Sequence, residues 1–132
     1  IVEDDPNARD FFCQAAQARG YTDIDTASSG EEALAKVVQA PYDLITLDIR
    51  LPGASGLDVL SIIRNMYPHM VIAIVSAHLS EDISSETAGC ADLVLSKPVP
   101  LEKLHRLLDS VSQICETLEH LSKIPDAPLP PD

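Results

Sequence analysis

Polar side chains follow four of the apolar runs in this sequence, and their types suggest chemistry. Glu3 and Asp4 follow the first run, Asp48 the third, Ser76 the fourth and Lys97 the fifth. In an open parallel sheet, ligands bind outside the carboxyl ends of the strands, so we expect these side chains to meet at one rim. That rim would carry three carboxylates, a hydroxyl and an ammonium group.

Three clustered carboxylates would repel one another unless a cation lay among them. Lys97 supplies one fixed positive charge, which cannot neutralise three negative charges. A hard divalent ion such as Mg²⁺, held by one or two carboxylates and several water molecules, meets this requirement. The pattern therefore predicts a Mg²⁺ site at the rim that carries Asp48.

Each of these residues also has a structural interpretation, which the sequence leaves open. Asp48 could hold the following loop by hydrogen bonds, Ser76 could be a solvated strand end, and Lys97 could be the counter-ion of a carboxylate. At the start of the chain, Asp4 or Asp5 could cap a helix. The clustering of all these groups at one rim favours the functional interpretation.

Five short apolar runs alternate with helical patterns, which predicts a parallel sheet with helices on both faces. The predicted strands are Ile1–Val2, Ile24–Ala27, Leu44–Leu47, Val71–Val75 and Leu93–Leu95. Three of them are apolar almost throughout, as expected of strands covered on both sides. The fold class is therefore α/β, with a doubly wound five-stranded parallel sheet.

Helix signals separate the predicted strands. The predicted helices begin at Asp5-Pro6, at a capping box of Ser29 and Glu32, at Ser55, near Glu81 and near Pro100. The fourth, about Glu81–Gly89, contains weak helix formers. The fifth runs to about Ser122, and its segment 115–124 would extend past the domain. Residues 125–132 contain four prolines and predict a linker or tail.

Apolar residues on the last predicted helix recur at alternating spacings of three and four, which is typical of a coiled-coil seam. They are Leu101, Leu104, Leu108, Val111, Cys115 and Leu118. We expect Ile114, Leu118 and Leu121 to present apolar surface to a second helix, from another copy or from a neighbouring domain. The alternative is that this stretch folds back onto its own domain.

Composition excludes some classes of partner. A net charge of −12 over 132 residues argues against direct nucleic-acid binding. No apolar run approaches the roughly 18 residues of a membrane span, so we expect no membrane insertion. The cysteines, Cys13, Cys90 and Cys115, form no C-x-x-C pair and indicate small buried side chains in a reducing cytoplasm. Ile1-Val2 is typical of a strand's end, so we expect a few apolar residues before it.

Four segments occur in an order that is typical of one family. They are Ile1–Pro6, Tyr42–Gly56, Val75–Ala77 and Leu95–Pro98. Together they closely resemble the receiver domains of two-component response regulators, over roughly residues 1–114. The resemblance implies a flavodoxin-like (βα)5 architecture and a conformational switch controlled by phosphorylation.

The resemblance implies a role for each residue that matches the family's motif. Asp48 would accept a phosphoryl group from a phosphohistidine on a sensor histidine kinase or phosphotransfer protein. Asp4 would bind Mg²⁺ directly, and Glu3 would act through water. The backbone carbonyl of Arg50 would complete the protein's share of the metal shell.

Ser76 and Lys97 would serve the phosphoryl group itself. By the resemblance, Ser76 would bond the new phosphoryl oxygens, and Lys97 would pair first with Asp48 and then with its phosphate. Pro98 would follow a cis peptide. The sequence departs from the family at Val94, where Tyr or Phe is usual; this leaves the chemistry intact but puts the family's usual readout face in question.

Other functional classes fit the residues less well. A phosphohydrolase with an aspartate nucleophile generally needs a second carboxylate two residues later, where this chain has Arg50. A nucleotide-binding domain would need a G-x-G-x-x-G or Walker-type loop, and the sequence contains neither. A constitutive interaction module that lost its switch is disfavoured by the intact rim residues and kept open by Val94. We expect no enzymatic activity beyond self-phosphorylation and slow self-dephosphorylation.

Overall fold

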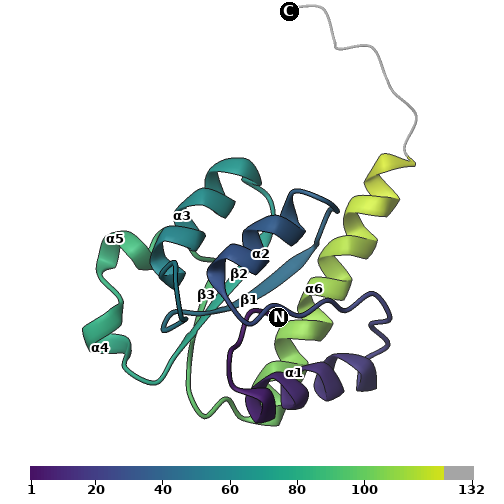
Figure 1. Ribbon diagram of the computed structural model, residues 1–132. Helices are drawn as coiled ribbons and strands as arrows, with labels where there is room; N and C mark the ends of the chain where they lie inside the picture. Colours follow the sequence, from purple (N-terminus) through teal and green to yellow (C-terminus); the bar gives the residue numbers. More distant parts are fainter. Residues whose placement is uncertain (124–132) are drawn as a thin grey trace, which may run out of the picture.

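Three parallel strands form the centre of the computed structural model, which describes residues 1–123 without the side chains of Ser80 and Ser122 (Figure 1). The strands are β1 (Leu44–Asp48), β2 (Val71–Ser76) and β3 (Leu93–Ser96), in the order β1-β2-β3. Each lies where the sequence predicts a strand and extends one residue further at its carboxyl end. The sheet therefore delivers Asp48 and Ser76 to the same edge.

The other two predicted strands are reduced to single parallel bridges. Val2 bridges Ala27 on one side and Leu47 of β1 on the other. The Val2 N–H donates to the Thr46 carbonyl at 2.8 Å, and the Asp48 N–H donates to the Val2 carbonyl at 3.0 Å. The five segments thus follow the flavodoxin-like order 2-1-3-4-5. The expected architecture is present, but the sheet has three strands with two bridged segments beside them.

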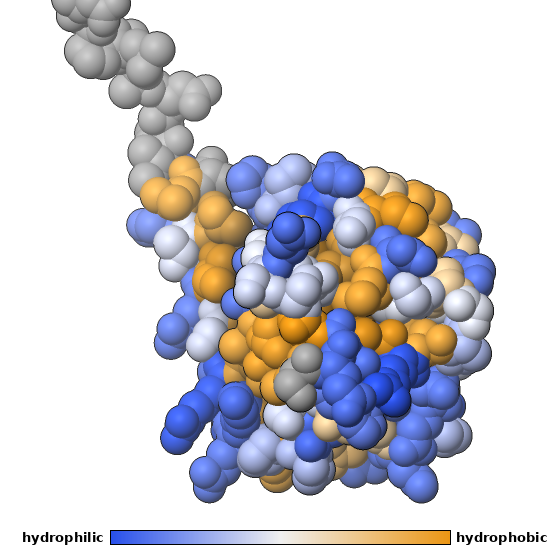
Figure 2. Space-filling model, turned by 90° about the vertical axis from the view of Figure 1, so that its left-hand side faces the viewer, coloured by the Kyte–Doolittle hydropathy of each residue, from blue (hydrophilic) through white to orange (hydrophobic). Residues whose placement is uncertain are grey.

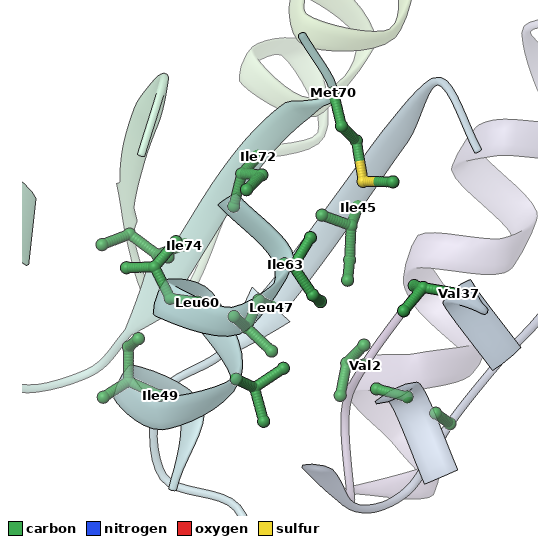
Figure 3. Close-up of a cluster of buried hydrophobic side chains, with 13 residues drawn as sticks. Val2, Val37, Ile45, Leu47, Ile49, Leu60, Ile63, Met70, Ile72 and Ile74 are labelled. Carbon is green, nitrogen blue, oxygen red and sulfur yellow. The ribbon is translucent and has the colours of Figure 1, made fainter. Parts of the chain in front are cut away.

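Helices cover both faces of the sheet. Helices α1 (Pro6–Ala18) and α6 (Leu101–Ser122) lie on one face, and α2 (Gly30–Val37) and α3 (Gly56–Met66) lie on the other (Figure 1). Strand β2 supplies both cores, because Ile72 and Ile74 face α3 while Ala73 and Val75 face α6. Figure 3 shows the first core, where Leu60 and Ile63 of α3 point at the strands. This alternation explains why β2 is apolar throughout.

Capping side chains fix three helix starts where the sequence predicts them. Asp5 accepts from the Asn7 N–H at 3.0 Å, Ser29 from Glu32 at 3.2 Å, and Ser55 from Asp58 at 3.3 Å. Only one of the two hydrogen bonds of the predicted capping box is present, the one that Ser29 accepts from Glu32. The Glu32 carboxylate accepts from the N–H of Ser28, at 3.0 Å, instead of from Ser29.

The predicted fourth helix, about Glu81–Gly89, is wrong as a single element. The chain forms two four-residue helices, α4 (Leu79–Asp82) and α5 (Ser85–Ala88). Between them Ile83 is extended, with φ −124° and ψ 115°. Ser84 then caps α5 by accepting from the Thr87 N–H at 3.2 Å. A serine hydroxyl that competes for backbone N–H groups favours a new helix start over continuation.

Helix α6 is as long as predicted, and its final turns carry exposed apolar side chains. Its buried residues end at Val111, whereas Ile114, Leu118 and Leu121 are 46%, 60% and 54% exposed. Figure 2 shows this apolar surface at the end of α6, where the grey tail begins. Among the described residues, these side chains therefore do not fold back onto the domain. The predicted tail, 125–132, lies outside the described residues.

The three cysteines are free thiols of intermediate exposure, so the expectation that they are buried was wrong. None of the helices within residues 1–123 combines the length and hydropathy of a membrane span.

Gly56 lets the start of α3 approach the end of β1, and its replacement should destabilise the fold. A Cβ there would lie 2.5 Å from the Asp48 carbonyl oxygen and 2.6 Å from the Ile49 Cα. Because both are backbone atoms, we expect Gly56→Ala to lower the free energy of unfolding by about 2 kcal/mol. In the control Gly89→Ala, the nearest atom would lie 3.3 Å away. Urea unfolding of both variants checks this, and equal midpoints would contradict it.

Candidate functional site

Three carboxylates meet at the carboxyl end of the sheet. Glu3 and Asp4 follow the bridged segment at Val2, and Asp48 ends β1 beside it. One oxygen from each carboxylate lies within 4.8 Å of the other two. Glu3 and Asp48 are 3% and 5% exposed, while Asp4 is exposed to solvent. The cluster thus has two buried members and one that faces solvent.

Lys97 joins two of these carboxylates. Its Nζ lies 3.1 Å and 3.0 Å from the two oxygens of Glu3, and 3.1 Å from Oδ2 of Asp48. The Lys97 backbone N–H donates to the Ser76 carbonyl at 2.9 Å, which ties the lysine to the end of β2. The following Lys97–Pro98 peptide is cis, as the resemblance implies.

Burial and pairing set the pKa values at the rim. Burial raises the pKa of Glu3, although the hydrogen bonds from Lys97 act in the opposite direction. Burial also disfavours the ammonium form of Lys97, but its hydrogen bonds to Glu3 and Asp48 outweigh this and raise its pKa. One ammonium against three carboxylates leaves negative charge in excess. The all-oxygen donor set suits a hard divalent cation such as Mg²⁺.

The loop after β1 is held closely against the site. The Arg50 N–H donates to Oδ1 of Asp48 at 3.1 Å, so both Asp48 oxygens have partners. Gly53 adopts a φ of +76°, and the next N–H, of Ala54, donates to Glu31 of α2 at 2.8 Å. The structural interpretation of Asp48 as a loop anchor is therefore correct, alongside any chemical role.

Ser76 lies at the rim, but its hydroxyl forms hydrogen bonds with residues outside the carboxylate cluster. It is 1% exposed, and its hydroxyl donates to Oδ2 of Asp82 at 2.7 Å. The same hydroxyl accepts from the His78 N–H at 3.0 Å. The Arg50 guanidinium also turns away from the cluster: it contacts Asp82 at 3.1 Å and Glu81 at 3.3 Å.

The sequence analysis missed Asp82 and overlooked the contact between Lys97 and Glu3. Asp82 stands in a segment of weak helix formers, where an acidic residue is ordinary, so no sequence signal distinguishes it. Asp5 caps α1 and is not among the three clustered carboxylates. The structure thus brings together Glu3, Asp4, Asp48 and Lys97, with Ser76 and Arg50 alongside and bonded to α4.

Comparison with known proteins agrees with this geometry. Residues 1–109 match the family model described as the response regulator receiver domain. The chain is 34% identical over 110 residues to the response regulator protein PilR of Pseudomonas aeruginosa, covering 82% of this chain and 24% of PilR. It is 30% identical over 131 residues to the sensory transduction protein LytR of Staphylococcus haemolyticus, covering 97% of this chain and 50% of LytR.

A solved structure with the same fold contains Mg²⁺-BeF. The response regulator TrrA of Thermotoga maritima, solved in complex with Mg²⁺-BeF, superposes with a TM-score of 0.73 at 36% identity, covering 83% of this chain and 94% of TrrA. The chain spans 24% of the PilR sequence and 50% of the LytR sequence that it matches. By family match, identity and fold, the chain belongs to the receiver domains of two-component response regulators.

Proposed function

We propose that Asp48 is the phosphoacceptor of this receiver, and that its donor is a phosphohistidine on a sensor histidine kinase or phosphotransfer protein. The observation that carries the proposal is the pairing of a buried strand-end carboxylate with Lys97 at 3.1 Å, next to Glu3 and Asp4. A buried aspartate among other carboxylates is costly unless cations balance its charge, as Lys97 does in part and a bound metal ion would do further.

The transfer needs few groups from the protein. An Asp48 oxygen attacks phosphorus, the new O–P bond forms, and the N–P bond breaks with the imidazole as leaving group. Such transfers depend mainly on positioning and on neutralising charge. The Arg50 N–H and Lys97 fix the two oxygens of Asp48 before the donor arrives. Lys97 is then placed to follow the negative charge onto the phosphoryl oxygens.

Mg²⁺ is the cofactor that the rim would take. Asp4 and Asp48 would bind it directly, and the Arg50 carbonyl would complete the protein's ligands. Both oxygens of Glu3 are already bonded to Lys97, which supports an indirect role for Glu3 through water. When bound, the ion would offset negative charge on the transferring group. The Mg²⁺-BeF complex of TrrA supports this assignment by similarity.

The remaining assignments concern the chain as a whole. We propose a receiver domain over residues 1–114, an extension of the last helix over 115–124, and a linker or tail over 125–132. The described part of this helix, α6, ends at Ser122, and residues 124–132 lie outside the described residues. We also propose a cytoplasmic location, no direct contact with nucleic acid, no membrane insertion, and no enzymatic activity beyond its own phosphorylation and slow dephosphorylation. The alternative function is a constitutive interaction module, in which Asp48 is never modified.

A test for phosphorylation of Asp48 distinguishes the phosphoacceptor receiver from the constitutive interaction module. Incubation with Mg²⁺ and acetyl phosphate should add one phosphoryl group to the intact mass of the chain. Reductive trapping of the acyl phosphate should then place it on Asp48, and Asp48→Asn should abolish it. The control Asp58→Asn, at an exposed position of α3, should be modified like the parent chain. Stable modification of Asp48→Asn would contradict the assignment, and an unmodified parent chain would favour the alternative.

We also propose that the exposed end of α6 packs against a second helix, from another copy of the chain or from a neighbouring domain. Self-association should give a dimer at micromolar concentration in sedimentation, because Ile114, Leu118 and Leu121 expose apolar surface beyond the core. Leu118→Glu with Leu121→Glu should weaken it. A matched pair on α3, Ile62→Glu with Met66→Glu, should not. A monomer at these concentrations would exclude self-association.

A further inference from the structure

Asp82 binds the side chains of two residues that border the proposed phosphorylation site. Its carboxylate accepts the Ser76 hydroxyl at 2.7 Å and the Arg50 guanidinium at 3.1–3.2 Å. The Arg50 backbone meanwhile donates to Asp48, so one residue is bonded to both aspartates. Hydrogen bonds from Arg50, and to a lesser extent from Ser76, lower the pKa of Asp82.

Resting on the proposed function, we propose that the Asp82 carboxylate is an internal substitute for the phosphoryl group. It occupies Ser76 and Arg50 in the unphosphorylated chain and is displaced when Asp48 is phosphorylated. We call the three residues Ser76, Asp82 and Arg50 the Asp82 latch. Its opening releases α4.

Ser76 cannot serve both acceptors at once. A serine hydroxyl has a single proton to donate, and here that proton points at Asp82. A phosphoryl group on Asp48 would bring three acceptor oxygens and nearly two negative charges, against the single charge of Asp82. It would also lie at the end of β1, whose Asp48 pairs with Val75, the residue before Ser76. The competition therefore favours the phosphoryl group.

Helix α4 depends on this side chain more than a longer helix would. It has only four residues, and His78 at its start provides no side-chain cap. A single turn of helix has little stability of its own. The backbone bonds that close it run from Glu81 and Asp82 to the His78 carbonyl and from Ile83 to Leu79. Loss of the Asp82 contacts should therefore loosen residues 79–83, and a partner could read this change without an aromatic residue at Val94.

Glu81 provides a matched control. It contacts the same guanidinium, at 3.3 Å, but in the described structure the Ser76 hydroxyl donates to Asp82 and not to Glu81, whose side chain is 70% exposed. Removing either carboxylate removes one negative charge from the same short helix. An effect that is specific to Asp82 cannot then be a general effect of charge.

Beryllofluoride serves as an analogue of the phosphoryl group on Asp48. Its binding in the presence of Mg²⁺ therefore tests the latch in the 132-residue chain. A hydrogen bond to a charged group contributes enough free energy to change an equilibrium constant by about tenfold. Calorimetry should therefore show that the Asp82→Ala variant binds beryllofluoride about tenfold more tightly than the parent chain. Glu81→Ala should bind like the parent chain. In a Ser76→Ala background, the gain from Asp82→Ala should shrink, since the competition acts through the Ser76 hydroxyl.

Amide hydrogen exchange supplies the structural readout. Beryllofluoride should speed exchange at residues 81–83 of the parent chain, and Asp82→Ala should exchange fast there without it. Equal affinities of Asp82→Ala and the parent chain, or an equal gain in Glu81→Ala, would overturn the latch while leaving Asp48 as the acceptor. A parent chain that neither binds beryllofluoride nor becomes phosphorylated would overturn the proposed function as well.

Discussion

The ammonium group of Lys97, bonded to Glu3 and Asp48, is the contact on which the rim depends. It joins Lys97 to Glu3, 94 positions earlier in the chain, and brings positive charge to the buried carboxylates of Glu3 and Asp48. Without it, both would be buried beside a like charge and without a cationic partner, which is strongly unfavourable. With it, an excess of negative charge still remains. That remainder supports the proposed binding of a divalent cation at the site.

The fold supplies this contact through strand order. Glu3 follows the segment bridged to β1, Asp48 ends β1, and Lys97 follows β3, whose neighbour β2 ends in Ser76. The lysine must therefore reach across the end of β2, and its N–H is fixed to the Ser76 carbonyl there. Gly56 adds the second constraint, because any side chain at that position would collide with the end of β1. The geometry of the carboxylate cluster and the packing of the core are thus both constrained at Asp48.

Much of this arrangement could be predicted from the sequence, because it follows from periodicity and from strand ends. Three strands, the helix caps at Asp5, Ser29 and Ser55, and the clustering of the carboxylates with Lys97 all follow from local patterns. Strand length at Ile24–Ala27 could not, since pairing depends on which neighbour offers hydrogen bonds. The break between α4 and α5 was also missed, although the Ser84 cap that starts α5 is a local feature.

Asp82 illustrates that limit. Its partners are Ser76 and Arg50, and the Arg50 contact is separated by 32 positions along the chain. No local pattern couples an aspartate in a weak helix to a strand-end serine. Val94, by contrast, was recognised as unusual from the sequence, and it is partly buried against the core beneath α3. A readout through α4 would suit a chain that lacks the aromatic side chain there.

We propose that the negative charge at the rim holds Mg²⁺ through Asp4 and Asp48. Calorimetric titration of Mg²⁺ into Asp4→Ala and Asp5→Ala tests it most directly, because the two neighbours have different roles. Asp4→Ala should lose most of the affinity of the parent chain. Asp5→Ala should retain that affinity and lose on the order of 1 kcal/mol of folding stability with its helix cap. Unchanged affinity in Asp4→Ala, with loss in Asp5→Ala, would contradict the account.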